Sequence, residues 1–444
     1  MKKNSNNIVL FFPIINPKTK YHWFPFSLLS IGATLQEKGF NPIVIDERIT
    51  PNYRELLLSH LRDVLFFGTT AMTGYQIKGA LDASEIVMKF NPKIKIVWGG
   101  RHASLMPEQT VKDPLVDVIV RGQGELTSVE IASLLKNGEP IDNVLGTTLK
   151  INKNIISNHS RPIFDVSKLH GFAWNLINIE DYINPETRAL GYFSSFGCPA
   201  RCGFCANSWD ERRWLSMKTD FILNDLEYLI TKYHFKNILF QDSNFFVNKK
   251  RVKDLAQGFL DRNFNVKWKA SIRADQLWKY EDDILSLLEK SGLYSLFMGI
   301  ESGSQRMLDQ MTKDTTPQDA IKSITKASKY SFEIHASLMF ALPNETIKDL
   351  EETIRHVEIL REINPNIKTQ TCFYSPYPST PLNELAEKGG FVPPNNLRDW
   401  QNTKEQTEFV IPPWFDKNIS EQYKKIFFKA FPTSAVTKFE KGKK

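Results

Sequence analysis

Cysteine is scarce in this chain, with four residues among 444. A disulfide framework is built from an even set of cysteines in a short secreted chain, so that class of protein is disfavoured. No run of 18 apolar residues occurs, and we expect no transmembrane helix. Residues 1–7 are polar and lead directly into a strand-like segment, so we expect no signal peptide and a cytoplasmic location.

A strong excess of charge of one sign is also absent. The chain has 57 Lys and Arg against 50 Asp and Glu, which gives a net charge of +7. This mild excess is compatible with an anionic cofactor or substrate and does not predict nucleic acid binding. The apolar content of 41% is typical of a soluble globular protein, and the length predicts two or three domains.

Strand-like and helix-like segments alternate over the first 150 residues. This alternation predicts parallel βαβ units in a doubly wound α/β sheet, with a ligand at the carboxyl ends of the strands. A G-x-G-x-x-G run after the first strand is absent, so a dinucleotide is disfavoured. The predicted strands are residues 8–13, 42–46, 63–70, 93–99 and 116–120, and the predicted helices are residues 25–38, 74–90 and 125–136.

Glycines and hydroxyl side chains follow three of these predicted strands. Glycine lets the backbone approach a bulky ligand, and hydroxyls can bond its polar groups. For any one loop, a tight turn is an equally good interpretation. The candidate binding residues are Gly68, Thr69, Thr70 and Thr73 after the third strand, Gly99, Gly100 and His102 after the fourth, and Gly122, Gly124 and Glu125 after the fifth.

Three of the four cysteines form the most specific motif of the chain. Cys198, Cys202 and Cys205 have the spacing C-x3-C-x2-C, with Phe204 before the third. Three thiolates can hold three irons of a [4Fe–4S] cluster and leave the fourth iron open to a small molecule. Zinc is the main alternative, but a zinc site usually has four ligands in paired C-x2-C units, and the sequence has no second pair.

This run resembles the signature of radical S-adenosylmethionine (SAM) enzymes. The resemblance implies that the open iron binds the amino and carboxylate groups of SAM, and that reduction yields a 5′-deoxyadenosyl radical. It also implies that Phe204 borders the adenine.

From Gly191 the strand–helix alternation resumes and predicts a partial (βα)6 TIM barrel, whose chemistry lies at the carboxyl ends of its strands. The resemblance places Asp242, Ser271, Arg273, Glu301 and Ser302 at the SAM site; a structural salt bridge or cap is the alternative for each charged residue. The predicted strands are residues 192–196, 237–242, 266–272, 293–301, 333–342 and 367–374, with helices at 221–233, 249–262 and 346–363.

The first 150 residues resemble the cobalamin-binding domain of B12-dependent radical SAM enzymes. The family carries Gly-Gly-x-His after strand four and Gly-Glu-Gly-Glu after strand five; here Gln123 replaces the first glutamate. The Asp-x-His-x-x-Gly motif of mutases is missing, so His102 is not assigned to cobalt, whose lower face is expected to hold water or nothing. We predict a cobalamin domain at residues 1–145, a hairpin and linker at 146–188, a radical SAM core at 189–390 and a short C-terminal helical region at 391–444.

Three further features bear on the substrate. Asn344 and Ser379 stand where the family often has glycine, so the substrate is not inferred from familiar relatives. Cys372 is predicted to be a small buried side chain, with a hydrogen donor near the substrate as the alternative. Residues 423–431 mix lysines and aromatics, which predicts packing on their own domain or, alternatively, peripheral contact with an anionic membrane.

The sequence therefore predicts a cobalamin-dependent radical SAM methyltransferase acting on an unactivated carbon of a small-molecule or lipid substrate, with [4Fe–4S], SAM and cobalamin as cofactors and a flavodoxin or ferredoxin as reductant. The alternative is a cyclase or rearrangement enzyme of the same architecture. An RNA methylthiotransferase is disfavoured because no cysteine precedes Cys198, and a non-catalytic cobalamin sensor is disfavoured by the intact cysteine motif.

Overall fold

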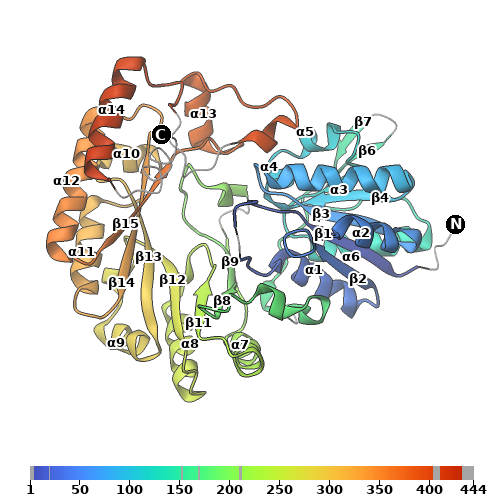
Figure 1. Cartoon of the computed structure of the whole chain (residues 1–444), viewed down its shortest axis with the longest axis horizontal. Coiled ribbons are helices and arrows are strands. Elements are labelled where there is room, and N and C mark those ends of the chain that lie inside the picture. Colours follow the sequence, from blue (N-terminus) through green and yellow to red (C-terminus); the bar gives the residue numbers. More distant parts are fainter. Residues whose placement is uncertain are drawn as a thin grey trace. The chain divides into compact units, whose positions relative to one another are not determined.

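The computed structural model describes residues 5–19, 21–151, 154–168, 171–209, 213–403 and 411–432 (Figure 1). The chain forms two compact units. Unit 1 comprises residues 1–184 and 394–403, and unit 2 comprises residues 185–393 and 404–444. The chain therefore passes between the units three times.

Unit 1 is built on a seven-stranded sheet with the order β2-β1-β3-β4-β5-β6-β7. The first five strands are parallel, and β6 and β7 are antiparallel additions at one edge. The strands are β1 (Asn7–Phe12), β2 (Asn41–Asp46), β3 (Phe66–Thr70), β4 (Lys95–Gly99), β5 (Val118–Val120), β6 (Thr147–Ile151) and β7 (Asn154–Ser157).

Helices cover both faces of this sheet, as the doubly wound prediction requires. Alternate residues of β1 belong to the two hydrophobic cores on opposite faces of the sheet. Val9 packs with the helix α3, and Ile8 packs with α1 and α6. The helices are α1 (Phe26–Glu37), α2 (Tyr53–His60), α3 (Gln76–Phe90), α4 (Gly100–Leu105), α5 (Pro107–Lys112) and α6 (Glu125–Asn137). The helices α2, α4 and α5 were not predicted, and the third strand starts later than predicted because Leu61–Asp63 forms a 3₁₀ turn.

Unit 2 contains the predicted partial barrel, an open sheet of six parallel strands in the order β15-β14-β13-β12-β11-β8. Figure 1 shows the helices on the outside of these strands. The strands are β8 (Ala189–Tyr192), β11 (Asn237–Phe240), β12 (Lys267–Arg273), β13 (Leu293–Glu301), β14 (Glu333–Phe340) and β15 (Lys368–Phe373), and the helices are α7 (Thr219–Tyr233), α8 (Lys249–Asp261), α9 (Asp282–Lys290), α10 (Gln305–Gln310), α11 (Pro317–Ala327) and α12 (Ile347–Ile363).

The first barrel strand differs from the prediction. It ends at Tyr192, and the following residues form β9 (Ser195–Gly197), which leaves the barrel and pairs antiparallel with β10 (Trp214–Ser216). The cysteine motif therefore follows a small ribbon rather than a barrel strand.

The C-terminal part of unit 2 contains α13 (Pro381–Lys388) and α14 (Lys417–Ala430). The ring of Phe427 in α14 lies 4.9 Å from that of Phe340 and 5.0 Å from that of Phe373, so the aromatic side of this helix packs on its own domain. Within the described ranges, none of the helices combines the length and apolar character that crossing a bilayer needs.

Candidate active site

The cysteine loop is held by backbone hydrogen bonds to two other segments of unit 2. Gly203 N donates to Met311 O at 2.7 Å, and Leu382 N donates to Gly203 O at 2.9 Å. Cys198, Cys202 and Cys205 are all half-buried and free of disulfides. The loop that carries the three cysteines is thus fixed in place.

A buried network fixes the chain just before Cys198. Asp242, two residues after β11, accepts hydrogen bonds from Ser194 N at 3.1 Å and Ser194 Oγ at 2.8 Å, and from the hydroxyl of Ser195. Its carboxylate lies 3.7 Å from the guanidinium of Arg251. Burial raises the pKa of Asp242, and Arg251 and the serines oppose this rise. The Asp242 carboxylate therefore accepts hydrogen bonds from groups of the protein itself, and its predicted contact with SAM stays a prediction.

Arg273, at the end of β12, bonds the cysteine loop directly. Its Nη1 donates to Cys202 Sγ at 3.4 Å, its Nη2 donates to Lys313 O at 2.6 Å and its Nε donates to Asp275 Oδ1 at 2.9 Å. Ser271, the other predicted residue of β12, is half-buried two positions earlier on the same face of the strand. The sequence predicts that Arg273 contacts the carboxylate of SAM, and this contact stays a prediction. In the structure its guanidinium bonds Cys202 and helps to position that side chain.

Glu301 ends β13 and forms a buried ion pair with Lys313, with Oε1 and Nζ 2.7 Å apart. Lys313 Nζ also lies 5.7 Å from the ring centroid of Phe204. A Cβ at Gly299 would lie 2.7 Å from Glu301 Oε1 and 2.9 Å from Lys313 Nζ, so glycine leaves room for the pair. Sequence reasoning missed Lys313, because a lysine in a short polar connection is normally exposed.

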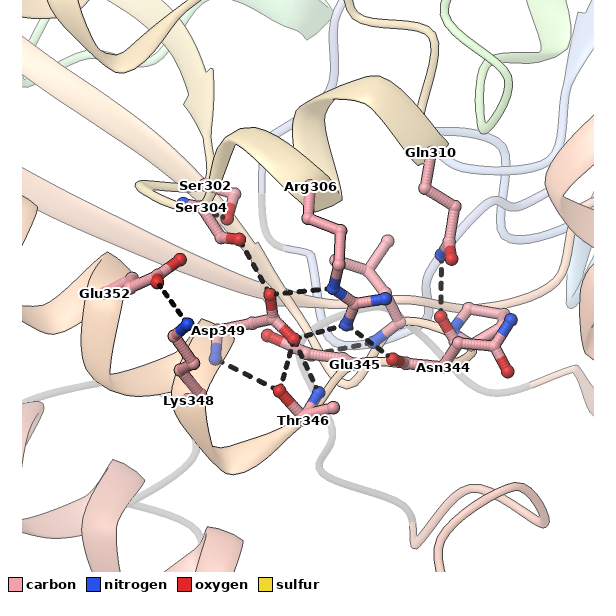
Figure 2. A network of polar contacts seen from close by, with 12 residues as sticks. Ser302, Ser304, Arg306, Gln310, Asn344, Glu345, Thr346, Lys348, Asp349 and Glu352 are labelled. Carbon is pink, nitrogen blue, oxygen red and sulfur yellow. Dashed lines mark hydrogen bonds and ion pairs between the residues drawn. The ribbon is translucent and has the colours of Figure 1, made fainter.

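Ser302, the next residue, is buried rather than open. Its hydroxyl lies 2.9 Å from Thr353 Oγ1 and accepts a hydrogen bond from Ser304 N at 3.1 Å. It belongs to the network of Figure 2, and its predicted role at the cofactor stays a prediction.

Figure 2 shows how the loop after β14 is held. Asn344 adopts a φ of +59°, a left-handed conformation that asparagine tolerates where the family often has glycine. Arg306 Nη2 donates to Asn344 O at 2.7 Å, and Gln310 Nε2 donates to Pro343 O at 2.6 Å. Burial raises the pKa of Glu345 to about 8, and Glu345 accepts a hydrogen bond from Tyr423 at 3.0 Å. The loop is therefore tied to α10 and to α14.

In unit 1, the predicted glycine loops lie at the carboxyl ends of three neighbouring strands, β3, β4 and β5. Gly100 has a φ of +89°, and a Cβ there would lie 2.4 Å from Thr70 Oγ1, so the loops after β3 and β4 touch. A Cβ at Gly99 would have only ordinary contacts, the nearest at 3.8 Å. Gly122 is left-handed at φ +76° and donates its N–H to Ser104.

His102 is completely buried where these loops meet. Its Nδ1 lies 3.0 Å from Thr73 Oγ1. Its ring packs edge-on against that of Trp400, with the two ring centroids 5.6 Å apart. Burial lowers the pKa of His102 to about 4.

The other predicted residues of unit 1 make internal contacts. Thr69 Oγ1 donates to Phe11 O at 3.2 Å, and Glu125 accepts a hydrogen bond from Ser30 at 2.7 Å. A Cβ at Gly68 would press on Leu10, and one at Gly124 would press on Ile31.

Exposed apolar side chains gather at the same edge of the sheet, a feature that sequence reasoning missed. They lie in the segments after β1 and β3, which are neighbours and whose helices α1 and α3 cover opposite faces. Such a switch point is where doubly wound sheets bind ligands. The side chains are Ile15, Tyr21, Trp23, Met72 and Tyr75, each 36–41% exposed.

Comparison with known proteins gives the same division of the chain. Residues 13–132 match the B12-binding domain, and residues 192–357 match the radical SAM superfamily. An uncharacterized methyltransferase of Pyrococcus horikoshii is 29% identical over 82% of this chain and 77% of its own length. An anaerobic magnesium-protoporphyrin IX monomethyl ester cyclase of Rubrivivax gelatinosus is 24% identical over 95% of this chain and 77% of its own length.

Solved structures share the fold. The cobalamin-dependent SAM radical enzyme OxsB, with aqua-cobalamin and SAM bound, has a TM-score of 0.77 at 17% identity, covering 96% of this chain and 67% of its own. The radical SAM methyltransferase TsrM of Kitasatospora setae, with cobalamin and a [4Fe–4S] cluster bound, has a TM-score of 0.72 at 16% identity, covering 87% and 76%.

The residues present suit these groups. Three cysteines outside any disulfide, on a fixed loop, match the three thiolate ligands of a site-differentiated cluster. Among the residues that the structure describes, no three His, Cys, Asp or Glu side chains surround a single metal ion. The exposed apolar edge of unit 1 suits a broad, largely apolar macrocycle. The chain belongs to the cobalamin-dependent radical SAM enzymes, which use a [4Fe–4S] cluster, SAM and cobalamin.

Proposed function

We propose that this chain is a methyltransferase that transfers a methyl group to an unactivated carbon of a small-molecule or lipid substrate. The observation that carries the proposal is the pairing of a fixed loop of three cysteines, none in a disulfide, with a cobalamin-binding unit in one chain. Relatives named as methyltransferases support it. When bound, the cofactors supply a carbon radical and a methyl group, chemistry that no side chain provides.

The side chains of unit 2 would bind and orient SAM. We propose that Glu301, Lys313 and Phe204 border it, with Ser271 nearby on β12. The buried pair presents a carboxylate and an ammonium 2.7 Å apart, which suits a ligand that itself carries an ammonium and a carboxylate. Arg273 would act through Cys202, which its guanidinium already bonds.

Three relatives are named as magnesium-protoporphyrin IX monomethyl ester cyclases, at 24–26% identity, and they favour the second candidate, a cyclase or oxidative enzyme without methyl transfer. The two candidates differ in their by-products. Methyl transfer consumes a second SAM and forms S-adenosylhomocysteine in addition to 5′-deoxyadenosine. Oxidation without methyl transfer forms 5′-deoxyadenosine and no S-adenosylhomocysteine.

The test uses the full chain, purified without oxygen and supplied with iron, sulfide and hydroxocobalamin. We expect about four irons and one cobalt per chain, and 5′-deoxyadenosine when SAM and a reductant such as flavodoxin or ferredoxin are added. Formation of S-adenosylhomocysteine with a methylated product supports methyl transfer; an oxidised product without S-adenosylhomocysteine contradicts it. A reducing cytoplasm is the location that suits an oxygen-sensitive cluster.

A further inference from the structure

Asn244 is a buried polar side chain without a hydrogen-bond partner. It lies between β11 and a 3₁₀ turn at Phe245–Val247, and only 1% of its surface is exposed. Neither its Oδ1 nor its Nδ2 forms a hydrogen bond. An unsatisfied buried amide is unfavourable, because it loses its bonds to water and gains none from the protein. Its position therefore needs an explanation.

A structural role as a helix cap does not account for it. Asn244 occupies the N-cap position of the 3₁₀ turn, where asparagine commonly accepts a hydrogen bond from the backbone, yet it makes no such bond. Asn248 provides the contrast four residues later, because it caps α8 and accepts from Arg251 N at 3.0 Å. The amide of Asn244 is directed elsewhere.

The neighbour it faces is Cys198. The Asn244 amide approaches the Cys198 thiol, as does the backbone of Ala200. A neutral thiol is a poor acceptor, and the structure shows no completed bond between the two side chains. A thiolate is a much better acceptor for an amide N–H.

The surrounding network holds the two residues together. Asp242, two residues before Asn244, bonds Ser194 and Ser195, which lie shortly before Cys198. The ends of β11 and of the segment that leads to the cysteine loop are therefore fixed to each other through one buried carboxylate. Asn244 is held beside Cys198 by contacts that do not depend on the cluster.

We propose that Asn244 donates a hydrogen bond from Nδ2 to the sulfur of Cys198 when that thiolate ligates iron, and that this bond raises the reduction potential of the [4Fe–4S] cluster. A hydrogen bond to a cluster sulfur stabilises the more negative, reduced state more than the oxidised state. Asn244 is thus a positioning and tuning residue for the electron that starts the reaction. Its role rests on the cluster and does not depend on whether a methyl group is transferred.

The experiment compares the cluster's reduction potential in full-length Asn244→Leu, Asn244→Asp and wild-type protein, measured by EPR-monitored titration without SAM. Leucine keeps the size and removes the donor, and aspartate replaces the donor by an acceptor. We expect the potential to become more negative in the order wild type, Asn244→Leu, Asn244→Asp. Asn364→Leu, at the C-terminus of α12, is the control, with an unchanged potential.

Iron content and circular dichroism establish that each variant carries its cluster. Loss of a weakly coupled exchangeable proton from the deuterium-exchange ENDOR spectrum of Asn244→Leu would support the bond directly. Equal potentials in wild type and Asn244→Leu, both with full iron content, would overturn the proposal. A difference that arises only after SAM is added would also overturn it, because Asn244 would then act on SAM rather than on Cys198.

Discussion

At the scale of single residues, the four cysteines separate into two kinds. Cys202 lies in the fixed loop and accepts a hydrogen bond from Arg273, whereas Cys372 is half-buried in β15. Burial raises the pKa of the Cys372 thiol, and the charge of Glu301 acts in the same direction. Both properties make Cys372 a poor ligand and a poor nucleophile at neutral pH.

We therefore predict that Cys202→Ser and Cys372→Ser differ in iron content. Cys202→Ser removes one of three thiolates and should hold far less than the roughly four irons of the intact cluster. Cys372→Ser should retain the wild-type amount. Iron and sulfide analysis of anaerobically reconstituted protein measures both, and a loss of iron in Cys372→Ser would contradict the assignment.

The pKa of Glu345 predicts how stability depends on pH. Because burial raises this pKa to about 8 in the folded state, from an ordinary 4.5, the folded state keeps a proton that the unfolded state releases. Stability should therefore fall as the pH rises through this interval. Burial lowers the pKa of His102 and His356 to about 4 in the folded state, and their contribution to the pH dependence is common to the wild type and a Glu345 variant, so a comparison of the two proteins removes it.

Between pH 6.5 and 8, deprotonation of Glu345 should thus lower the free energy of unfolding of the wild type by up to about 2 kcal/mol. Glu345→Gln is always neutral and can still accept from Leu342 N, which lies 2.9 Å from Oε2. Its unfolding free energy should change less over this interval than that of the wild type, as measured by urea unfolding at both pH values. Parallel pH profiles in the two proteins would rule out this role for Glu345.

Sequence reasoning could select Glu301 and Arg273 as candidates but could not find the residues that they contact. Both were selected because they lie at predicted strand ends and match motif positions of the family that the sequence resembles. Their contacts, with Lys313 and with Cys202, depend on how distant segments meet in space. Arg273 and Cys202 are 71 residues apart, and no local pattern encodes that approach.

At the scale of elements, two helices begin with the same capping box. Thr316 with Asp319 caps α11, and Thr346 with Asp349 caps α12. The second box also holds the loop after β14, because Asp349 additionally accepts from Ser304 Oγ at 2.7 Å and from Arg306, whose Nη2 donates to Asn344 O (Figure 2).

Thr316→Ala and Thr346→Ala should each destabilise the protein by about 1 kcal/mol, since each removes one N-cap bond. Only Thr346→Ala should also speed amide hydrogen exchange in the loop at residues 341–346. Chemical unfolding and hydrogen-exchange mass spectrometry measure the two effects. Equal exchange in that loop for both variants would show that the α12 box does not hold it.

The adjacent glycines at the end of β4 and the start of α4 provide a second matched pair. Gly100 has a φ of +89° and no space for a Cβ, whereas Gly99 has a φ of −132° and only ordinary contacts. Gly100→Ala should cost more than about 1 kcal/mol and reduce the retained cobalamin, because the loops after β3 and β4 must separate. Gly99→Ala should cost less. Thermal unfolding and cobalt content test this, and equal effects would contradict it.

Long, regular elements were predicted well, and short ones were not. The strand β13 was predicted at its observed bounds, because nine residues with a clear pattern identify themselves. The helices α4 and α5 have six residues each, fewer than two helical turns, which is too short for a recurring apolar pattern. The residues of β9 were assigned to the first barrel strand. They leave the barrel because they pair with β10, in which Trp214 lies opposite Gly197, 17 residues earlier in the chain. Such a pairing between separate segments has no local sequence pattern.

At the scale of the whole molecule, the most informative feature is the return of residues 394–403 to unit 1. Leu397 and Trp400 belong to the core that covers one face of the first sheet. Trp400 Nε1 donates to Gln109 Oε1 at 2.6 Å, and Arg398 Nε donates to Asp113 Oδ2 at 2.9 Å. Sequence reasoning placed this segment in the C-terminal region, because nothing local indicates contacts 285–291 residues away.

This return predicts that a mutation near the C-terminus affects the cobalamin unit. Trp400→Ala removes a ring that is 1% exposed and contacts His102, so it should cost about 3–5 kcal/mol. The variant should retain less cobalt but keep its iron and its reductive cleavage of SAM, since the cysteine loop belongs to unit 2. Trp414→Ala, whose side chain packs on the core of unit 2, is the matched control and should leave cobalt retention intact. If Trp400→Ala bound cobalamin as tightly as the wild type, the loops after β3 and β4 would hold the cofactor without this segment, and the third passage of the chain would serve stability alone.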